Sequence, residues 1–370
     1  MFFLITWTLA SSFMPEIYPR LDPIEYWIMG IIGAVILFIS VLLHELAHSF
    51  VALKYGLKVR QIVLFIFGGV SDIEEEESSK DFRKEFKIAA VGPLTSFVIA
   101  GILALPLLIL NQVNVEDTIV TISIAEGVLY YGTLVNLLIG GFNLIPAFPL
   151  DGGRILRSAL LRWKKDYDQS TKIAARVGIA ISYGFMAFAF VVVFAGSFIS
   201  GIWLLLIGWF LNSGAQSYLA QQELSSILSG VRLGNIMNSK VISVKEDITI
   251  DRLIKDYFNV YAKDSFPVVN DFNYLLGMVT FKDAMNVSDY RRDSVKVIDV
   301  MIPKTNLIIM NPNRTADDVL IQMTRKQMAR VFICDEEGRL IGLVSKTDIM
   351  NAASERKEYM KAAKKLAENK

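Results

Sequence analysis

The chain has only two histidines, and both lie in one five-residue segment, His44-Glu45-Leu46-Ala47-His48. On a helix, residues four apart share one face, so both imidazoles can reach a single Zn²⁺ ion. Glu45 directly follows the first histidine, where its carboxylate can take a proton from a water molecule at the metal. The spacing therefore indicates a zinc centre that activates water. The alternative is a pair of histidines buried in a core without a ligand.

A catalytic zinc ion commonly has three protein ligands, and the sequence holds no third histidine. The single cysteine, Cys334, lies in the charged C-terminal region, so the third ligand should be a carboxylate. Asp151 is the candidate, because Pro146 and Pro149 should break a helix just before it. The pair Gly152-Gly153 permits a turn behind it. The alternative is a solvated aspartate at a helix end.

The elements that must carry these residues are those of a membrane protein. Hydrophobic residues make up 53% of the chain and charged residues 20%, and the mean hydropathy is +0.43. We predict a polytopic α-helical membrane domain of about six transmembrane helices over residues 1–220. The net charge of +1, without a basic patch, gives no case for a nucleic acid partner. The apolar runs lie near residues 1–14, 26–54, 85–110, 123–148, 177–197 and 200–220.

Basic residues cluster in alternate loops, which sets the expected orientation. Loops 54–87 and 154–176 are rich in Lys and Arg, whereas 111–122 and 195–200 have none. The alternation predicts a multi-pass protein of the cell membrane with both termini and the region 221–370 in the cytoplasm. His44 lies ten residues before Lys54. At the helical rise it would therefore lie about 15 Å from the cytosolic end of its span.

The C-terminal region repeats itself. Residues 231–288 align with 295–353 at an offset of 64 to 65, and short strands alternate with amphipathic helices in both copies. In both copies the last predicted strand is followed by a hydroxyl residue and, three positions later, an aspartate: Thr280/Asp283 and Ser345/Asp348. We expect a linker over 221–230 and a solvated C-terminal helix over 354–370.

Residues 1 to about 220 resemble the site-2 protease family of intramembrane zinc metalloproteases. The resemblance rests on His44-Glu45-x-x-His48 in one span and, in a later span, on Asn143-x-x-Pro146 with Leu150-Asp151-Gly152. A further shared motif is Gly92-Pro93-Leu94-Thr95-Ser96, which lies between them. The pair Gly68-Gly69, after the apolar run from Ile62 to Phe67, looks like the family's membrane-embedded edge strand, which would pair with an extended substrate.

The resemblance implies a role for each residue of the candidate site. His44, His48 and Asp151 would bind one Zn²⁺ per chain. Glu45 would activate water and later protonate the leaving amine. Asn143 would assist at the scissile carbonyl.

The repeated region resembles a tandem pair of cystathionine-beta-synthase (CBS) domains, a soluble α/β module with the element order βαββα. The resemblance implies an adenine nucleotide site, for ATP, ADP or AMP, at Thr280/Asp283 and Ser345/Asp348, whose carboxylates would accept hydrogen bonds from ribose hydroxyls. The alternative is that these residues only cap the following helices. CBS modules often pair face to face, so a homodimer is a further expectation.

We therefore hypothesise an intramembrane zinc endopeptidase that cleaves transmembrane segments of single-span membrane proteins, with the CBS pair sensing adenine nucleotide. Two alternatives belong to other classes. A metal or ion transporter with a CBS pair would also place histidines and a carboxylate in the membrane, but it does not require Glu45 between the histidines. A catalytically idle scaffold would lack bound zinc.

Overall fold

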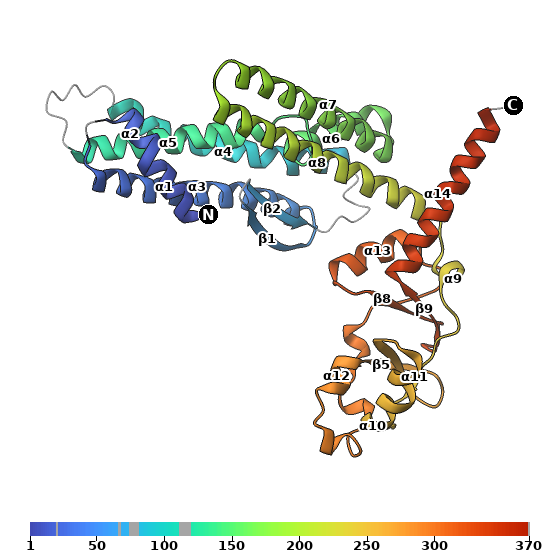
Figure 1. Ribbon diagram of the computed structural model, residues 1–370. Helices are drawn as coiled ribbons and strands as arrows, with labels where there is room; N and C mark the ends of the chain where they lie inside the picture. The colour runs from blue at the N-terminus through green and yellow to red at the C-terminus, as the bar shows by residue number, and fades with distance from the viewer. Residues whose placement is uncertain (20, 66–67, 74–80, 111–119, 369–370) are drawn as a thin grey trace. The chain divides into compact units, whose positions relative to one another are not determined.

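The computed structural model describes residues 1–19, 21–65, 68–73, 81–110 and 120–368 (Figure 1). The chain divides into two compact units, Met1–Gln222 and Glu223–Lys370, and each has its own fold. The first unit consists of helices and one β-hairpin. The second contains a four-stranded and a three-stranded sheet with helices around them.

The first unit is built around the long helix α3, Pro23–Lys54, whose N-cap is Asp22. There the backbone N–H of Asp22 donates to the Glu25 carboxylate, at 2.7 Å, and so caps the helix start. Against α3 pack three short helical segments, the hairpin and the next two long helices. The elements are α1 Phe2–Thr8, a π-helical turn Leu9–Phe13, α2 Met14–Ile17, β1 Val59–Phe65, β2 Gly68–Ile73, α4 Phe82–Leu110, α5 Val120–Asn143, α6 Asp151–Lys164, α7 Tyr167–Phe194 and α8 Phe198–Leu228.

Five helices in the described part of the chain are long and apolar enough to cross a membrane, where the sequence predicted about six. They are α3, α4, α5, α7 and α8. The first predicted run, 1–14, forms the short apolar stretch Phe2–Ile17. At about 1.5 Å per residue it falls short of the roughly 30 Å hydrocarbon core. It packs on α3 and α5 through Leu9, Met14 and Tyr131 instead.

Polar and apolar side chains in this unit are distributed as in a membrane protein whose outer surface faces lipid. Large apolar side chains such as Phe50, Ile102 and Phe194 are exposed on the long helices. Polar side chains are buried between helices and bond to one another: Asn136 Nδ2 donates to Ser40 Oγ at 2.9 Å, and Asn212 Nδ2 donates to Ser182 Oγ at 3.0 Å. In hydrocarbon such groups find partners only within the protein. These observations establish the multi-pass membrane character.

The hairpin β1–β2 is antiparallel and packs beside α3. Phe65 pairs with Gly68 at its tip, and Leu64 pairs with Gly69. The apolar run expected as an edge strand therefore forms β1 as far as Phe65. Its last two positions, 66–67, lie outside the described residues, as do parts of the loops 54–87 and 111–122.

The second unit contains the two repeats. The four-stranded sheet contains β3 Val244–Lys245, β4 Ser265–Val269 and β5 Leu275–Thr280 of the first repeat and β6 Ile302–Pro303 of the second. The three-stranded sheet contains β7 Ile309–Met310, β8 Arg330–Cys334 and β9 Leu340–Ser345 of the second repeat. The registers match: Ser265 pairs with Thr280 as Arg330 pairs with Ser345, and both pairs of strands shift register near the same end. The structural offset between repeats is thus 65 along both strands.

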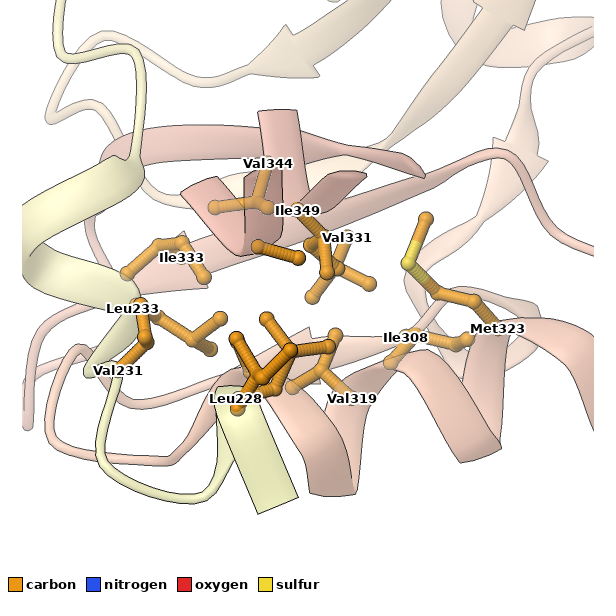
Figure 2. Packing of buried hydrophobic residues seen from close by; sticks show 13 residues of the cluster. Leu228, Val231, Leu233, Ile308, Val319, Met323, Val331, Ile333, Val344 and Ile349 are labelled. Carbon is orange, nitrogen blue, oxygen red and sulfur yellow. The ribbon is translucent and has the colours of Figure 1, made fainter. Parts of the chain in front are cut away.

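The helices of the second unit close each repeat. They are α9 Leu233–Ile236, α10 Ile250–Arg252, α11 Asn259–Tyr261, α12 Phe281–Met285, α13 Ala316–Arg325 and α14 Lys346–Glu368. Figure 2 shows the core of the second repeat, where Val331, Ile333 and Val344 from the sheet meet Val319 and Ile349 from the helices. The core is apolar throughout, as burial of strand faces requires.

The segment 221–230, expected as a linker, is mostly helical. Helix α8 continues through Leu228, and Ile227 and Leu228 are buried in the core of the second repeat. The sequence has no proline or glycine between 221 and 229 to stop the helix, and Gly230 follows its end. Over the predicted tail, α14 is helical as far as Glu368, and most of the residues in 354–366 are exposed.

Candidate metal centre and nucleotide pocket

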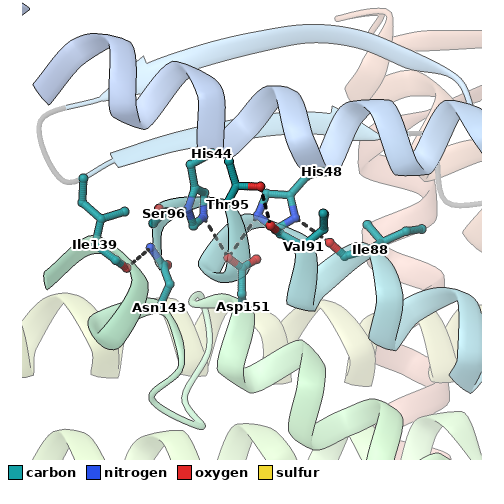
Figure 3. Close-up of polar contacts among 9 residues, drawn as sticks. All are labelled: His44, His48, Ile88, Val91, Thr95, Ser96, Ile139, Asn143 and Asp151. Atoms are coloured by element: carbon teal, nitrogen blue, oxygen red, sulfur yellow. Dashed lines mark hydrogen bonds and ion pairs between the residues drawn. The ribbon is translucent and has the colours of Figure 1, made fainter. Parts of the chain in front are cut away.

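Two histidines and one aspartate converge in the membrane unit (Figure 3). His44 Nε2 and His48 Nε2 each lie 3.1 Å from the same oxygen, Asp151 Oδ2. Both histidines are buried, and the Asp151 side chain is 12% exposed. One ligand atom from each residue lies within 4.8 Å of the others, so the three can hold one ion.

The second nitrogen of each imidazole is held by α4. His48 Nδ1 donates to the backbone carbonyl of Ile88 at 2.6 Å, and His44 Nδ1 shares a hydrogen bond with Ser96 Oγ at 2.9 Å. These contacts fix the rings with both Nε2 atoms facing Asp151, as in metal sites where an outer contact orients each ligand. Pro93 lies inside α4 and removes one helical hydrogen bond close to the Ile88 carbonyl.

Space for the two imidazoles depends on Gly92. A Cβ atom at Gly92 would lie 2.1 Å from His48 Nε2 and 2.7 Å from His44 Nε2. Ile88, Gly92 and Ser96 are spaced by four, so all three lie on one face of α4. This spacing could have revealed from the sequence which face of α4 supports the histidines. Our interpretation of residues 92–96 as a shared family motif did not assign these contacts.

Asp151 is the first residue of α6, after an irregular segment 144–150 that contains Pro146 and Pro149. The helix break expected from the prolines is present. Gly152 and Gly153 do not form the turn that we expected, because both are helical. A Cβ at Gly152 would lie 2.2 Å from the Ile145 carbonyl oxygen, and one at Gly153 would lie 2.7 Å from the Phe148 nitrogen. They let the irregular segment pack directly on the helix start.

Glu45 is buried beside the two histidines, with 7% of its surface exposed. Gly69 of β2 approaches it closely: a Cβ at Gly69 would lie 2.3 Å from Glu45 Cγ. Asn143 is the last residue of α5, and its amide donates to the Ile139 carbonyl one turn earlier at 3.0 Å. The structure therefore places Glu45 at the cluster, whereas the Asn143 amide bonds within its own helix.

The donor set fits zinc. Two imidazole nitrogens and one carboxylate oxygen form a three-ligand set that leaves one position open, the arrangement of catalytic zinc sites. The thiol of Cys334 lies in the other unit and is buried in β8. Burial raises the pKa of that thiol to about 11, which disfavours the thiolate that binds metal.

In the second unit, both hydroxyl–aspartate pairs form helix caps. Asp283 accepts from the backbone N–H and hydroxyl of Thr280, at 3.1 and 2.6 Å. Asp348 accepts from the same groups of Ser345, at 2.8 and 2.7 Å. The two motifs are thus equivalent as helix caps.

The motifs differ in their surroundings. A cavity of about 260 Å³ is lined by Ser345 and Asp348, together with the basic residues Lys240, Lys263 and Arg330. Thr280 and Asp283 do not line this cavity. A basic cavity with a carboxylate at one side suits a phosphorylated ligand that also carries hydroxyl groups.

Arg330 is already paired within the cavity wall. Its guanidinium donates to the Asp264 carboxylate at 2.5 Å and also to the Ser265 hydroxyl. The hydrogen bond from Arg330 holds the pKa of Asp264 below its ordinary value. A phosphate bound at Arg330 would share this cation with Asp264.

Comparison with known proteins agrees with these two units. The profile of peptidase family M50 matches residues 32–123 and 113–185, and the CBS domain profile matches residues 233–290 and 297–355. Of the two segments that match the M50 profile, the first contains both histidines and the second contains Asp151.

The relatives extend over nearly the whole chain. Rip3 of Mycobacterium tuberculosis, which carries a zinc metalloprotease name, is 30% identical over 349 residues, covering 94% of this chain and 86% of that protein. A zinc metalloprotease of Methanocaldococcus jannaschii is 33% identical over 329 residues, covering 88% and 87%. The solved site-2 protease of M. jannaschii is 35% identical, with a TM-score of 0.39, covering 58% of this chain and 88% of that one.

The packing of Gly92 against the imidazoles predicts a specific loss. We expect Gly92→Ala to reduce the affinity for zinc more than tenfold, because the added methyl group must displace a histidine ring at an overpacking cost of about 1–3 kcal/mol. The measurement is the zinc affinity of the purified protein by chelator competition. Gly101→Ala on the same helix is the matched control, since a Cβ there meets nothing within 4 Å. Equal zinc affinity in the two variants would show that Gly92 does not limit the site.

Proposed function

The chain belongs to peptidase family M50, the zinc metalloproteases that include the site-2 proteases, and we propose that it hydrolyses peptide bonds within or near transmembrane segments of single-span membrane proteins. The observation that carries the proposal is the convergence of His44, His48 and Asp151, with Glu45 buried beside them, between helices apolar enough to span a membrane. The transporter alternative offers no reason for Glu45.

Each residue of the cluster has a defined role in the proposed reaction. His44, His48 and Asp151 would hold the zinc ion, which when bound supplies a Lewis acid that acidifies water and polarises a peptide carbonyl. Glu45 takes a proton from the attacking water, whose oxygen forms the new bond to the carbonyl carbon. The same carboxyl then gives the proton to the leaving amine nitrogen as the C–N bond breaks. One peptide bond and one water become an acid and an amine.

Asn143 serves the substrate carbonyl in this proposal, as the resemblance to the family implies. Its amide donates to the Ile139 carbonyl in the structure, so it would have to turn away from its own helix to reach a substrate. The side chain lies at the end of α5, next to the irregular segment, where such a rotation meets less helical backbone.

The substrate must offer an extended backbone, because the carbonyls of a helix already accept hydrogen bonds. The two-stranded hairpin packs beside α3 and has only two strands, so it can accept a further strand at an edge. Gly69 of this hairpin contacts Glu45, which places the paired backbone close to the proposed base.

For orientation we propose that both termini and the CBS pair are cytoplasmic, from the Lys and Arg content of the loops 54–87 and 154–176. Water would then reach the metal from the cytosolic side, and the released fragment would be cytosolic. A homodimer through the CBS modules remains a prediction.

We propose further that the CBS pair binds one adenine nucleotide in the basic cavity and that this binding regulates proteolysis. Lys240, Lys263 and Arg330 would face the phosphates, and Asp348 would accept hydrogen bonds from the ribose hydroxyls. The first motif, Thr280/Asp283, would serve mainly as a helix cap.

Substitution of the proposed base tests the peptidase function. Glu45→Gln should lower cleavage of a single-span substrate in detergent or liposomes by about 10²–10⁴-fold, because the amide cannot take the proton from water. The zinc content of the variant should equal that of the wild type, since Glu45 is not a proposed ligand. Proteolysis at the wild-type rate would refute the proposal.

The two equivalent caps give a matched test of the nucleotide site. Asp348→Ala should weaken ATP binding to the full chain about tenfold or more, because a hydrogen bond to a charged group is worth roughly 1.5–3 kcal/mol. Asp283→Ala removes the same kind of cap and should leave the affinity unchanged within about twofold. The measurement is titration calorimetry with ATP. Equal losses in both variants would assign the effect to capping and not to a ligand contact.

A further inference from the structure

A buried ion pair in the membrane unit has no role in the proposed reaction. Glu85, near the start of α4, and Arg157, in the middle of α6, are each 4% exposed. Arg157 Nη2 lies 2.5 Å from Glu85 Oε1, and Nε donates to the same oxygen at 2.6 Å. Removing two charges from water is costly, and apolar replacements are often at least as stable. Fold stability is therefore a weak explanation for the pair.

The pair connects α6, which carries Asp151, to α4, whose contacts orient the two imidazoles. Glu85 lies three residues before Ile88, whose carbonyl accepts from His48 Nδ1, so both are within one turn of α4. Arg157 lies six residues after Asp151 on α6. The ion pair thus ties the helix that carries the carboxylate to the turn that orients one imidazole.

The guanidinium also contacts the segments on either side of α6. Arg157 Cζ lies 5.4 Å from the centroid of the Phe148 ring, in the irregular segment before Asp151. It lies 4.7 Å from the Tyr167 ring, at the start of α7. A flat guanidinium can stack on aromatic faces while it bonds a carboxylate, and an ammonium group cannot make both contacts in the same way. Arg157 therefore holds α4, α6, α7 and the irregular segment together.

We propose that the Glu85–Arg157 pair is a positioning device for the metal centre: it fixes the start of α6 against α4 and thereby sets the distance from Asp151 to the two histidines. The inference rests on the proposed metal centre. In this proposal both residues act through Asp151 and Ile88.

The test removes the pair without leaving a buried charge. In the double variant Glu85→Leu/Arg157→Met, both positions stay filled by apolar side chains, and thermal stability should remain close to that of the wild type. The zinc affinity, measured by chelator competition on the full chain, should fall about tenfold or more, the range seen when contacts outside the ligand set are lost. The visible absorption of the Co²⁺-loaded protein should also change, because it reports the ligand geometry.

A control separates positioning from general loosening of the helices. The variant Ser182→Ala/Asn212→Leu removes a buried hydrogen bond between α7 and α8, neither of which carries a proposed ligand. It should keep the zinc affinity and the Co²⁺ spectrum of the wild type. Wild-type zinc affinity and spectrum in the folded Glu85→Leu/Arg157→Met variant would overturn the positioning role.

Arg157→Lys decides the question if the double variant does not fold. It keeps the charge beside Glu85 but loses the flat contact with both rings, and it should bind zinc about threefold to tenfold more weakly. Unchanged zinc affinity and an unchanged Co²⁺ spectrum would then overturn the proposal. A wild-type protein that binds no zinc would instead refute the proposed metal centre, so the two failures are distinguishable.

Discussion

The membrane unit depends on one contact between side chains: a carboxylate from α6 must reach two buried imidazoles of α3. His44 and His48 are four residues apart on one helix, so their own separation is set by helix geometry. The position of Asp151 is not set in that way, because it comes from a helix more than 100 residues later in the chain. The surrounding packing serves this third position. The close approach of Gly152 and Gly153, the irregular segment before them and the contacts of Arg157 all act on the start of α6.

The lack of a side chain at two glycines is as important to this centre as the side chains that form it. At Gly92 and Gly69 a single methyl group would collide with a histidine or with Glu45. Helix α4 and strand β2 therefore approach α3 at backbone distance, as small residues permit in membrane proteins. Helix α3 supplies the two histidines and Glu45, and α6 supplies Asp151. Helix α4 and strand β2 supply space, and α4 adds the Ser96 hydroxyl and the Ile88 backbone carbonyl.

The sequence was sufficient for the residues whose chemistry follows from type and spacing. Helical periodicity predicted the His44/His48 face, and the lack of other ligands led to Asp151. Hydropathy predicted about six spans; in the described residues five helices are long and apolar enough to cross a membrane, and the run at 1–14 forms a shorter apolar stretch. The backbone carbonyl of Ile88 could not be found from residue types, since every residue has one. The repeat was visible in the sequence, but the cavity beside the second motif depends on Lys240, Lys263 and Arg330, which come from separate segments. The helical continuation of α8 through 221–228 was missed because tertiary packing of Ile227 and Leu228 decides it.

Both histidines of the chain lie in this one cluster, with ring centroids 4.9 Å apart. Isotopic labelling of histidine would therefore label the candidate centre and nothing else in the protein. Any imidazole resonance, and any histidine-directed photochemistry, would report on α3 beside Asp151 without background from the surface or from the CBS pair. Because the chain has no other histidine, the imidazole signals of the protein report only on the candidate centre.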